Sequence, residues 1–242
     1  MNNTEKSKTA NIKDWPKTDR PREMLLDKGA EALSDAHLLA ILLRTGRQGQ
    51  NAIDLAREML NTFGGIRGLL STTHEDLLKI KGVGNAKIAH ILAAMEIVRR
   101  QLRQPLELTN LIRNPEDLYE YLEVSMCNLN REEFRVLHLN RSNHLIAEET
   151  LFKGTVDASA IYAREVLESA LRKRATALIL AHNHPTGPPI ASSEDINLTQ
   201  ALVRACGTVD IPVLDHIIVG NGGCLSMKRE YPEIFSGDDE VA

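Results

Sequence analysis

The sequence contains few cysteines, and their positions exclude the common structural uses of that residue. Cys127, Cys206 and Cys224 are odd in number and far apart, and no two of them have the C-x-x-C spacing of many metal and redox sites. A framework of disulfide bonds is therefore not expected. The pattern indicates the reducing environment of the cytoplasm.

The chain also lacks a long apolar run. No stretch approaches the roughly 20 consecutive apolar residues that a membrane-spanning helix needs. The first six residues, Met1 to Lys6, are polar and lack the apolar core of a signal peptide. We find no internal repeat and no low-complexity tract. A cytoplasmic protein without a membrane partner is therefore expected.

Length and charge point to two modules. The 242 residues are 43% hydrophobic and 26% charged, as in a globular protein with an ample core. The net charge of −4 is unevenly distributed. Residues 1–104 hold 17 Lys and Arg against 12 Asp and Glu, whereas residues 105–242 hold 12 against 21. A basic N-terminal part and an acidic C-terminal part suggest different partners.

Two histidines follow an apolar segment in the C-terminal part. Residues 177–181 (ALILA) precede His182, Asn183, His184 and Pro185, and this pattern predicts a buried strand that ends in a loop. Side chains two residues apart on a strand share a face. His182 and His184 would therefore project the same way at the end of this strand.

Ser192 and Asp195 follow at the start of a predicted helix. Asp195 would lie in the first turn, from which its carboxylate can turn back toward the two histidines. Two imidazoles and one carboxylate leave the fourth position of a tetrahedral zinc ion open for water, as in catalytic zinc sites. Ser192 and Asp195 also fit an ordinary capping box, and the two roles can coexist.

The order His182-x-His184, seven residues, Ser192, two residues, Asp195 resembles the JAMM motif of the MPN+ (JAB) metalloprotease family. The sequence His-Asn-His-Pro-x-Gly, with Asp215-His216 downstream, is similar more narrowly to the bacterial RadC family. This resemblance implies one Zn²⁺ per chain, held by His182, His184 and Asp195. It also implies that the C-terminal part is a JAB/MPN α/β sandwich of the cytidine-deaminase-like kind.

The JAMM resemblance further implies a glutamate on an earlier strand as general base. Glu148 and Glu149 are the candidates, and they would point to opposite faces of one strand, so only one of them can serve. The spacing to Phe152-x-Gly154-Thr155, compared with the family pattern, favours Glu149. Ser192 would stabilise the developing oxyanion.

Other polar residues have weaker claims. Glu165 lies in a predicted helix and is a less favoured base. Asp215 and His216 would support the site or pack near it, and neither is expected to be a ligand. A nucleobase deaminase would need H-x-E and P-C-x-x-C ligands, which the chain lacks, so that class is rejected.

A short helix, a tight turn and a long helix are predicted at residues 73–80, 81–84 and 85–103. This order resembles a helix-hairpin-helix, which the RadC family also carries near its N-terminus. The Gly-x-Gly turn would let the backbone approach a phosphate, with lysines beside it as charge donors. The predicted contacts of residues 73–103 with duplex DNA are Lys81, Gly82, Gly84 and Lys87, and they would not read its sequence. The alternative is a helical hairpin that serves packing or protein contact.

Four segments are predicted along the chain. They are a flexible N-terminal arm (1–20), a helical helix-hairpin-helix domain (21–104), a linker with a lead-in helix (105–119) and the JAB/MPN+ metal-binding domain (120–242). In the last, we expect strands at 134–139, 144–152, 177–181 and 209–214, helices starting at Asp157 and Glu194, and a final hairpin of 216–219 with 224–227.

The sequence thus predicts an α/β protein with an all-helical N-terminal domain. Its predicted function is that of a JAMM-type zinc metallohydrolase, a metallopeptidase or isopeptidase, that acts on a peptide or protein. The hydrolytic class comes from the resemblance alone. RadC proteins are labelled as DNA-repair factors, so the alternative is a non-enzymatic accessory protein of DNA repair or recombination with a zinc-binding domain. The oligomeric state is left open.

Overall fold

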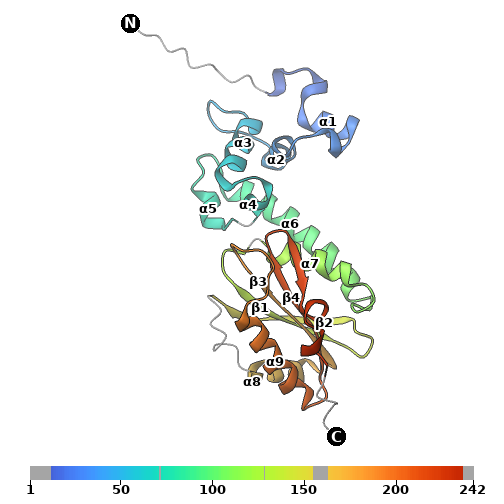
Figure 1. Ribbon diagram of the computed structural model, residues 1–242. Helices are drawn as coiled ribbons and strands as arrows, with labels where there is room; N and C mark the ends of the chain where they lie inside the picture. The colour runs from blue at the N-terminus through green and yellow to red at the C-terminus, as the bar shows by residue number, and fades with distance from the viewer. Residues whose placement is uncertain (1–11, 71, 128, 155–162, 237–242) are drawn as a thin grey trace. The chain divides into compact units, whose positions relative to one another are not determined.

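The structure is a computed structural model that describes residues 12–70, 72–127, 129–154 and 163–236. The chain divides into two compact units between residues 97 and 98 (Figure 1). No helix within the described ranges is both long and apolar enough to cross a membrane.

The first unit is built of helices. They are α1 (Pro21–Lys28), α2 (Asp35–Leu43), α3 (Ala52–Phe63), α4 (Ile66–Leu70), α5 (His74–Leu78) and the first part of α6 (Asn85–Leu106). Asn51 begins α3, because its side chain accepts the N–H groups of Ile53 and Asp54 at 2.9 and 3.0 Å. Gly64 ends it with a φ of +75°. The core lies mainly between α2 and α3 and includes Leu39, Leu43, Ile53, Leu55 and Met59.

Residues 12–20, assigned above to a flexible arm, are folded. They form two 3₁₀ turns, Ile12–Asp14 and Lys17–Asp19. Arg20 donates from Nε to the Trp15 carbonyl at 2.9 Å and from Nη2 to the Lys13 carbonyl at 2.7 Å. Arg20 thus fastens the segment, and Ile12 and Trp15 also pack against the hydrophobic core of the unit. Two isolated apolar residues form no periodic pattern, so the sequence did not reveal these contacts. The remainder of the predicted arm, residues 1–11, lies outside the described residues.

The second unit contains one five-stranded sheet. Its strands are β1 (Glu133–Leu139), β2 (Leu145–Lys153), β3 (Ala177–Asn183), β4 (Val213–Gly220) and β5 (Gly223–Ser226). The order is β2-β1-β3-β4-β5, and only β3 and β4 run parallel. The mixed α/β class predicted for this part is confirmed.

Helices cover both faces of the sheet (Figure 1). On one face, α7 (Pro115–Met126) packs with the end of α6, and on the other α8 (Ala163–Lys173) and α9 (Ser193–Gly207) pack together. Segment 105–119, expected to be a linker with a lead-in helix, belongs to the first of these layers. Its residues Leu106, Leu111 and Leu118 are buried in the core.

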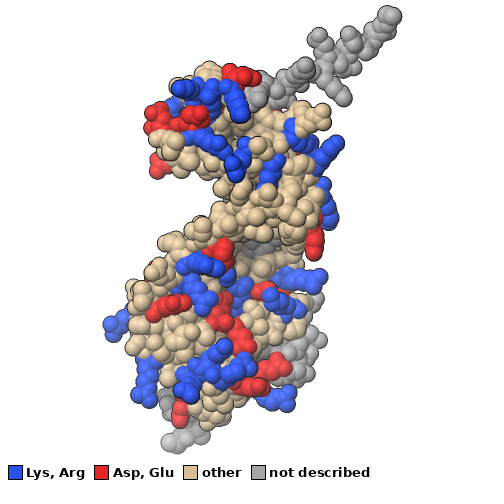
Figure 2. All heavy atoms as spheres, turned by 180° about the vertical axis from the view of Figure 1, so that it is seen from behind, with Lys and Arg blue, Asp and Glu red and all other residues tan. Residues whose placement is uncertain are grey.

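Two local predictions have different outcomes. A strand at 209–214 followed by a break was expected, but β4 is continuous and starts later, because Asp210, with a φ of +57°, still belongs to the turn after α9. The predicted helix start at Asp157 lies outside the described residues. Figure 2 shows acidic and basic side chains interspersed over one face of the sheet unit, without a large area of one sign.

Candidate metal centre

The two histidines lie at the end of the central strand β3. His182 is 2% exposed and is flanked by Phe134 of β1 and Ile218 of β4. His184 follows the strand, and its N–H donates to the Val219 carbonyl at 2.7 Å. The loop after it packs tightly against the end of β4, because a Cβ on Gly220 would meet backbone atoms of Pro188 and Pro189 at 2.6 and 2.5 Å. Only glycine permits this close approach.

Asp195 reaches the histidines from the first turn of α9. It is 7% exposed and forms the predicted capping box, because its carboxylate accepts the Ser192 N–H at 2.8 Å while Ser192 Oγ accepts the Asp195 N–H at 3.1 Å. The Ser192 hydroxyl also donates to Asp195 Oδ2 at 2.7 Å. The cap therefore fixes the carboxylate while leaving it directed at the imidazoles.

Three donor atoms of these residues converge. The two Nε2 atoms of His182 and His184 lie 3.0 Å apart, and Asp195 places Oδ1 3.1 Å from the first and Oδ2 3.5 Å from the second. Ligands about 2.1 Å from a tetrahedral zinc ion are separated by about 3.4 Å. The spacing of the three donors therefore fits such an ion. Among the described residues, this is the one group of three or more His, Cys, Asp or Glu side chains that could hold a metal.

A buried chain of hydrogen bonds sets the tautomer of His182. The Thr199 hydroxyl donates to the Asp195 carbonyl at 2.6 Å and lies 2.7 Å from Nδ1 of His216, so that Nδ1–H donates to it. Burial lowers the pKa of His216 well below its usual value, so the ring is neutral and its Nε2 must accept. His182 Nδ1, 2.8 Å from that atom, therefore donates. The Nε2 of His182 is left with a lone pair.

His184 has the same tautomer as His182. Its Nδ1 lies 3.3 Å from the Pro188 carbonyl, an acceptor, so in the neutral ring Nε2 again carries the lone pair. The two lone pairs and the carboxylate then face one another at short range. They repel one another unless a proton or a cation lies between them. Protons on the imidazoles can take this place: they give Asp195 hydrogen bonds that hold its pKa well below its usual value, although burial alone would raise that pKa. A cation is what this donor set favours.

Glu149, the predicted base, is directed to α8. Ser169 Oγ donates to its Oε2 at 2.6 Å, and Arg172 Nη2 donates to both of its oxygens at 2.7 Å. It does not line the pocket at the histidines. The register explains this, because Glu149 on β2 pairs with Val136, and the whole of β1 lies between it and β3.

Glu148 points to the other face, as strand alternation predicts. Its Oε1 accepts from Arg135 Nη1 at 2.9 Å and its Oε2 accepts from the Tyr121 hydroxyl under α7. Its side chain is 9% exposed and belongs to a buried ionic network that also includes Glu133. Neither of the two predicted candidates therefore faces the metal centre. Glu165, the weaker candidate, is exposed on α8.

Glu132 is the carboxylate that sequence reasoning missed. It lines a pocket of about 410 Å³ together with His182, His184, Ser192 and Asp195. Its charge is close enough to help raise the pKa of His184, after the larger effect of the Asp195 hydrogen bond. The sequence signal was its place immediately before β1, which runs antiparallel to β3 and so begins beside the histidines.

Asn183, between the two histidines, holds the chain on both sides of Glu132. Its Oδ1 accepts the Glu133 N–H at 2.8 Å, and its Nδ2 donates to the Arg131 carbonyl at 3.2 Å. Asn183 is fully buried. The middle residue of the His-x-His pair thus places the backbone of Glu132 opposite the ligands.

Asp215 and His216 have separate roles. His216 supports His182, as described above. Asp215 accepts the N–H groups of His216 and Lys228 at 2.7 and 3.0 Å and the Ser226 hydroxyl at 2.6 Å. It thereby joins β4 to α10 (Met227–Glu230) and is not a ligand candidate.

Residues of the predicted DNA-contacting hairpin form hydrogen bonds within the protein. Lys87 Nζ donates to the carbonyls of Gly46 and Gly82 at 3.0 and 2.7 Å, and burial lowers its pKa. The Lys81 carbonyl accepts from Arg47 Nη1 at 2.7 Å, while the Lys81 side chain is exposed. Gly84 has open space around it. The contact of Lys87 with DNA stays a prediction, and the loop 46–50, distant in sequence, supplies one of the carbonyls that Lys87 binds within the protein.

Comparison with known proteins places this geometry in a family. Residues 112–232 match the model of the RadC-like JAB domain, and residues 12–89 match the UPF0758 N-terminal model. A UPF0758 protein of Alcanivorax borkumensis is 47% identical over 89% of this chain and 96% of its own length. One of Azotobacter vinelandii is 46% identical over 90% of this chain and 98% of its own length. The chain belongs to the UPF0758 (RadC) family.

Membership of the UPF0758 family confirms the predicted family and the JAB-like fold of the second unit. A third relative, from Cellvibrio japonicus, is 44% identical over 90% of this chain and bears the same family name. These names describe a family and no activity. The chemistry therefore has to be argued from the metal centre.

Proposed function

We propose that this UPF0758 protein is a zinc metallohydrolase that cleaves a peptide or isopeptide bond. The observation that carries the proposal is the convergence of two imidazole lone pairs and a carboxylate beside a further carboxylate, Glu132, in one pocket. His182, His184 and Asp195 would hold the ion, which leaves one position of a tetrahedral zinc open. Zinc bound there would lower the pKa of a water molecule and polarise a carbonyl.

Within this proposal Glu132, in place of Glu149, is the general base. It would accept the proton of the attacking water on its carboxylate and then deliver it to the leaving nitrogen. Asn183 keeps its backbone in place for this proton transfer. The base and the metal ligands thus come from two antiparallel segments joined by side-chain hydrogen bonds.

Ser192 remains the proposed stabiliser of the oxyanion. It lines the pocket, and its hydroxyl donates to Asp195 Oδ2 in the structure. To serve an oxyanion, that hydroxyl has to rotate toward the substrate, while the Ser192 N–H can continue to hold Asp195 at 2.8 Å.

Metal analysis combined with activity profiling tests the proposal. The purified chain should contain about one Zn²⁺, and the double variant His182→Ala/His184→Ala should lose most of it, because one carboxylate alone is a weak zinc site. The control is His144→Ala, which lies outside the pocket. Zinc should be measured by mass spectrometry, and hydrolysis should be followed on peptide and isopeptide libraries with and without a chelator.

The outcomes separate the two candidate functions. Cleavage that chelation abolishes and added zinc restores supports the hydrolase. Full zinc content in the double variant contradicts the ligand set. A protein that binds zinc through these residues and cleaves no library member would instead favour the non-enzymatic accessory role.

A further inference from the structure

The pocket at the metal centre is lined by carboxylates beyond those that the proposed chemistry uses. Glu132, Glu194 and Asp195 all line its volume of about 410 Å³. None of the described residues that form its walls is a lysine or an arginine. Glu132 is the proposed base and Asp195 a proposed ligand, whereas Glu194 has no role in the reaction. Its position in the pocket therefore needs a separate explanation.

Glu194 is exposed at the second position of α9, where Ser193 Oγ donates to its Oε2 at 3.0 Å. An acidic side chain there stabilises the helix through the helix dipole, and Glu116 has the same position in α7. That stabilisation does not depend on what the side chain faces. Glu194 differs from Glu116 because it lies on the wall of the pocket that contains the metal centre.

Glu194 is also the chain neighbour of a proposed ligand. Consecutive Cα atoms lie about 3.8 Å apart, so Glu194 and Asp195 leave the backbone side by side at the start of α9. A substrate whose bond reaches the metal therefore has its adjoining side chain within reach of Glu194. Pro185 and Leu198 add apolar wall, against which the stem of a lysine or an arginine can pack while its charged end stays at the rim.

The charge of the loaded centre favours a cation as well. Three carboxylates line the pocket, and a bound Zn²⁺ would neutralise two of their charges. The two histidines add no charge, since imidazole binds a metal in its neutral form. One negative charge is left over. Electrostatic complementarity therefore selects a positively charged group and rejects an acidic one.

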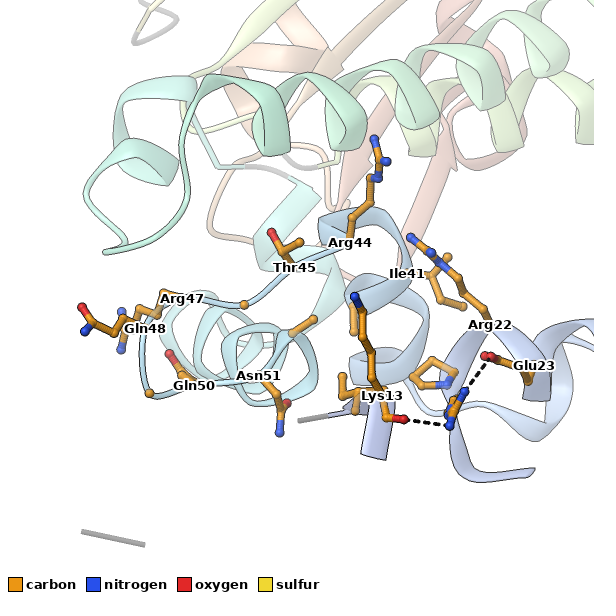
Figure 3. A pocket seen from close by; sticks show the side chains of 17 residues that line it. Lys13, Arg22, Glu23, Ile41, Arg44, Thr45, Arg47, Gln48, Gln50 and Asn51 are labelled. Carbon is orange, nitrogen blue, oxygen red and sulfur yellow. Dashed lines mark hydrogen bonds and ion pairs between the residues drawn. The ribbon is translucent and has the colours of Figure 1, made fainter. Parts of the chain in front are cut away.

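Another pocket of the chain has the opposite lining. It lies in the helical unit, has a volume of about 940 Å³ and contains Glu23 as the one carboxylate among its lining residues (Figure 3). Its basic lining residues are Lys13, Arg20, Arg22, Arg44 and Arg47. An acidic lining is thus particular to the pocket at the metal centre. Acidic peptides have a competing site in the helical unit, so a test has to compare variants of one residue at the metal centre.

We propose that the metal centre takes peptides in which a lysine or an arginine adjoins the bond at the metal, and that Glu194 selects this residue. The substrate class named here rests on the proposed function, since it concerns the same pocket. Glu194 forms an ion pair with the ammonium or guanidinium group of the substrate. It transfers no proton in the reaction, so its effect is on the choice of substrate.

Binding of labelled peptides by the full-length chain tests the proposal, with fluorescence anisotropy as the measurement. Three short alanine-rich peptides differ only in a central Lys, Gln or Glu. The zinc-loaded Glu132→Gln protein is used so that the probes are not hydrolysed, and their integrity is checked by mass spectrometry. The lysine peptide should bind about three- to five-fold more tightly than the glutamine peptide, the effect of one exposed ion pair. The glutamate peptide should bind more weakly than both, and added salt should reduce the differences.

Substitution of Glu194 in the same protein assigns the preference. Glu194→Gln should remove the advantage of the lysine peptide over the glutamine peptide, and Glu194→Lys should reverse the order of the lysine and glutamate peptides. Glu116→Gln and Glu116→Lys are the matched controls, because Glu116 is exposed at the same helix position outside the pocket. Thermal unfolding should fall by a similar small amount in the two lysine variants, since each places a cation at a helix N-terminus.

The outcomes separate this specificity from the hydrolase itself. Equal binding of the three peptides, or equal effects of the Glu194 and Glu116 variants, would overturn the selection by Glu194. So would a wild-type protein that hydrolyses library peptides with a ratio of kcat/KM for lysine and glutamate peptides that Glu194→Lys leaves unchanged, although the hydrolase would then stand. A preference for lysine that depends on Glu194 supports the basic ligand even where no peptide is hydrolysed, and in that case only the hydrolase proposal fails.

Discussion

Glu132→Gln and Glu149→Gln are expected to have opposite effects on catalysis. Each substitution keeps the shape of the side chain and removes its charge and its ability to accept a proton. Glu132 lines the pocket beside the histidines, whereas Glu149 is bound to Ser169 and Arg172 on α8. Only the first change removes a carboxylate that can reach a water molecule in that pocket.

The magnitudes follow from these environments. Loss of a general base lowers the rate by roughly a hundred-fold to ten-thousand-fold, which corresponds to about 2.7–5.5 kcal/mol in the barrier. Glu149→Gln removes an ion pair whose side chains are 30% and 52% exposed, a contact worth about 0–1 kcal/mol of stability. The glutamine oxygen still accepts from Ser169. The activity of the Glu149→Gln variant should therefore stay close to that of the wild type.

Turnover of a substrate identified in the peptide and isopeptide libraries provides the assay. Zinc content and thermal unfolding should be measured for both variants, so that lost metal or lost folding is not mistaken for lost catalysis. Both variants should retain zinc. A Glu132→Gln protein with full activity, or a Glu149→Gln protein that retains zinc and has lost activity, would refute the assignment of Glu132.

Two further substitutions test the packing within each unit, at Glu148 in the sheet unit and at Gly82 in the helical unit. Glu148→Gln leaves Arg135, whose side chain is 10% exposed, with a weaker partner. It should lower the free energy of unfolding, measured with a chemical denaturant, by about 1.5–3 kcal/mol. The control Glu120→Gln changes an exposed residue and should have little effect. The pKa of Tyr121, which burial and the Glu148 charge raise to about 12, should fall in the Glu148→Gln variant when followed by absorbance. Gly82→Ala would place a Cβ 2.7 Å from Arg47 Cβ at a φ of +88° and should cost about 1–3 kcal/mol, whereas Gly84→Ala has open space and should leave the unfolding temperature nearly unchanged. Equal unfolding temperatures for the two alanine variants would contradict the packing of the hairpin on the loop at Arg47.

The features that sequence reasoning placed well depend on short-range geometry. Strand alternation brings His182 and His184 to one side, and the first turn of a helix brings Asp195 back toward them over a few residues. The JAB-like fold and the family followed from the same motif. In each case the residues that matter are close in sequence, so periodicity and capping rules suffice.

The features that sequence reasoning did not place depend on contacts between distant segments. Glu149 and Glu132 could be told apart only by knowing that β1 lies between β2 and β3 and begins beside the histidines. The hydrogen bond from Lys87 to the Gly46 carbonyl could not be foreseen either, because Gly46 lies 41 residues earlier in the chain. Strand order and loop packing of this kind are not encoded in any local pattern.

The two hydrogen bonds of Asn183 have a consequence for the motions of the centre. Because they tie the backbone on both sides of Glu132 to β3, a displacement of β3 carries the glutamate with it. The distance between the glutamate and the histidines is thus insulated from movements elsewhere in the sheet. Local opening would have to break both bonds before that distance could change, so donors and glutamate should loosen as one cooperative element.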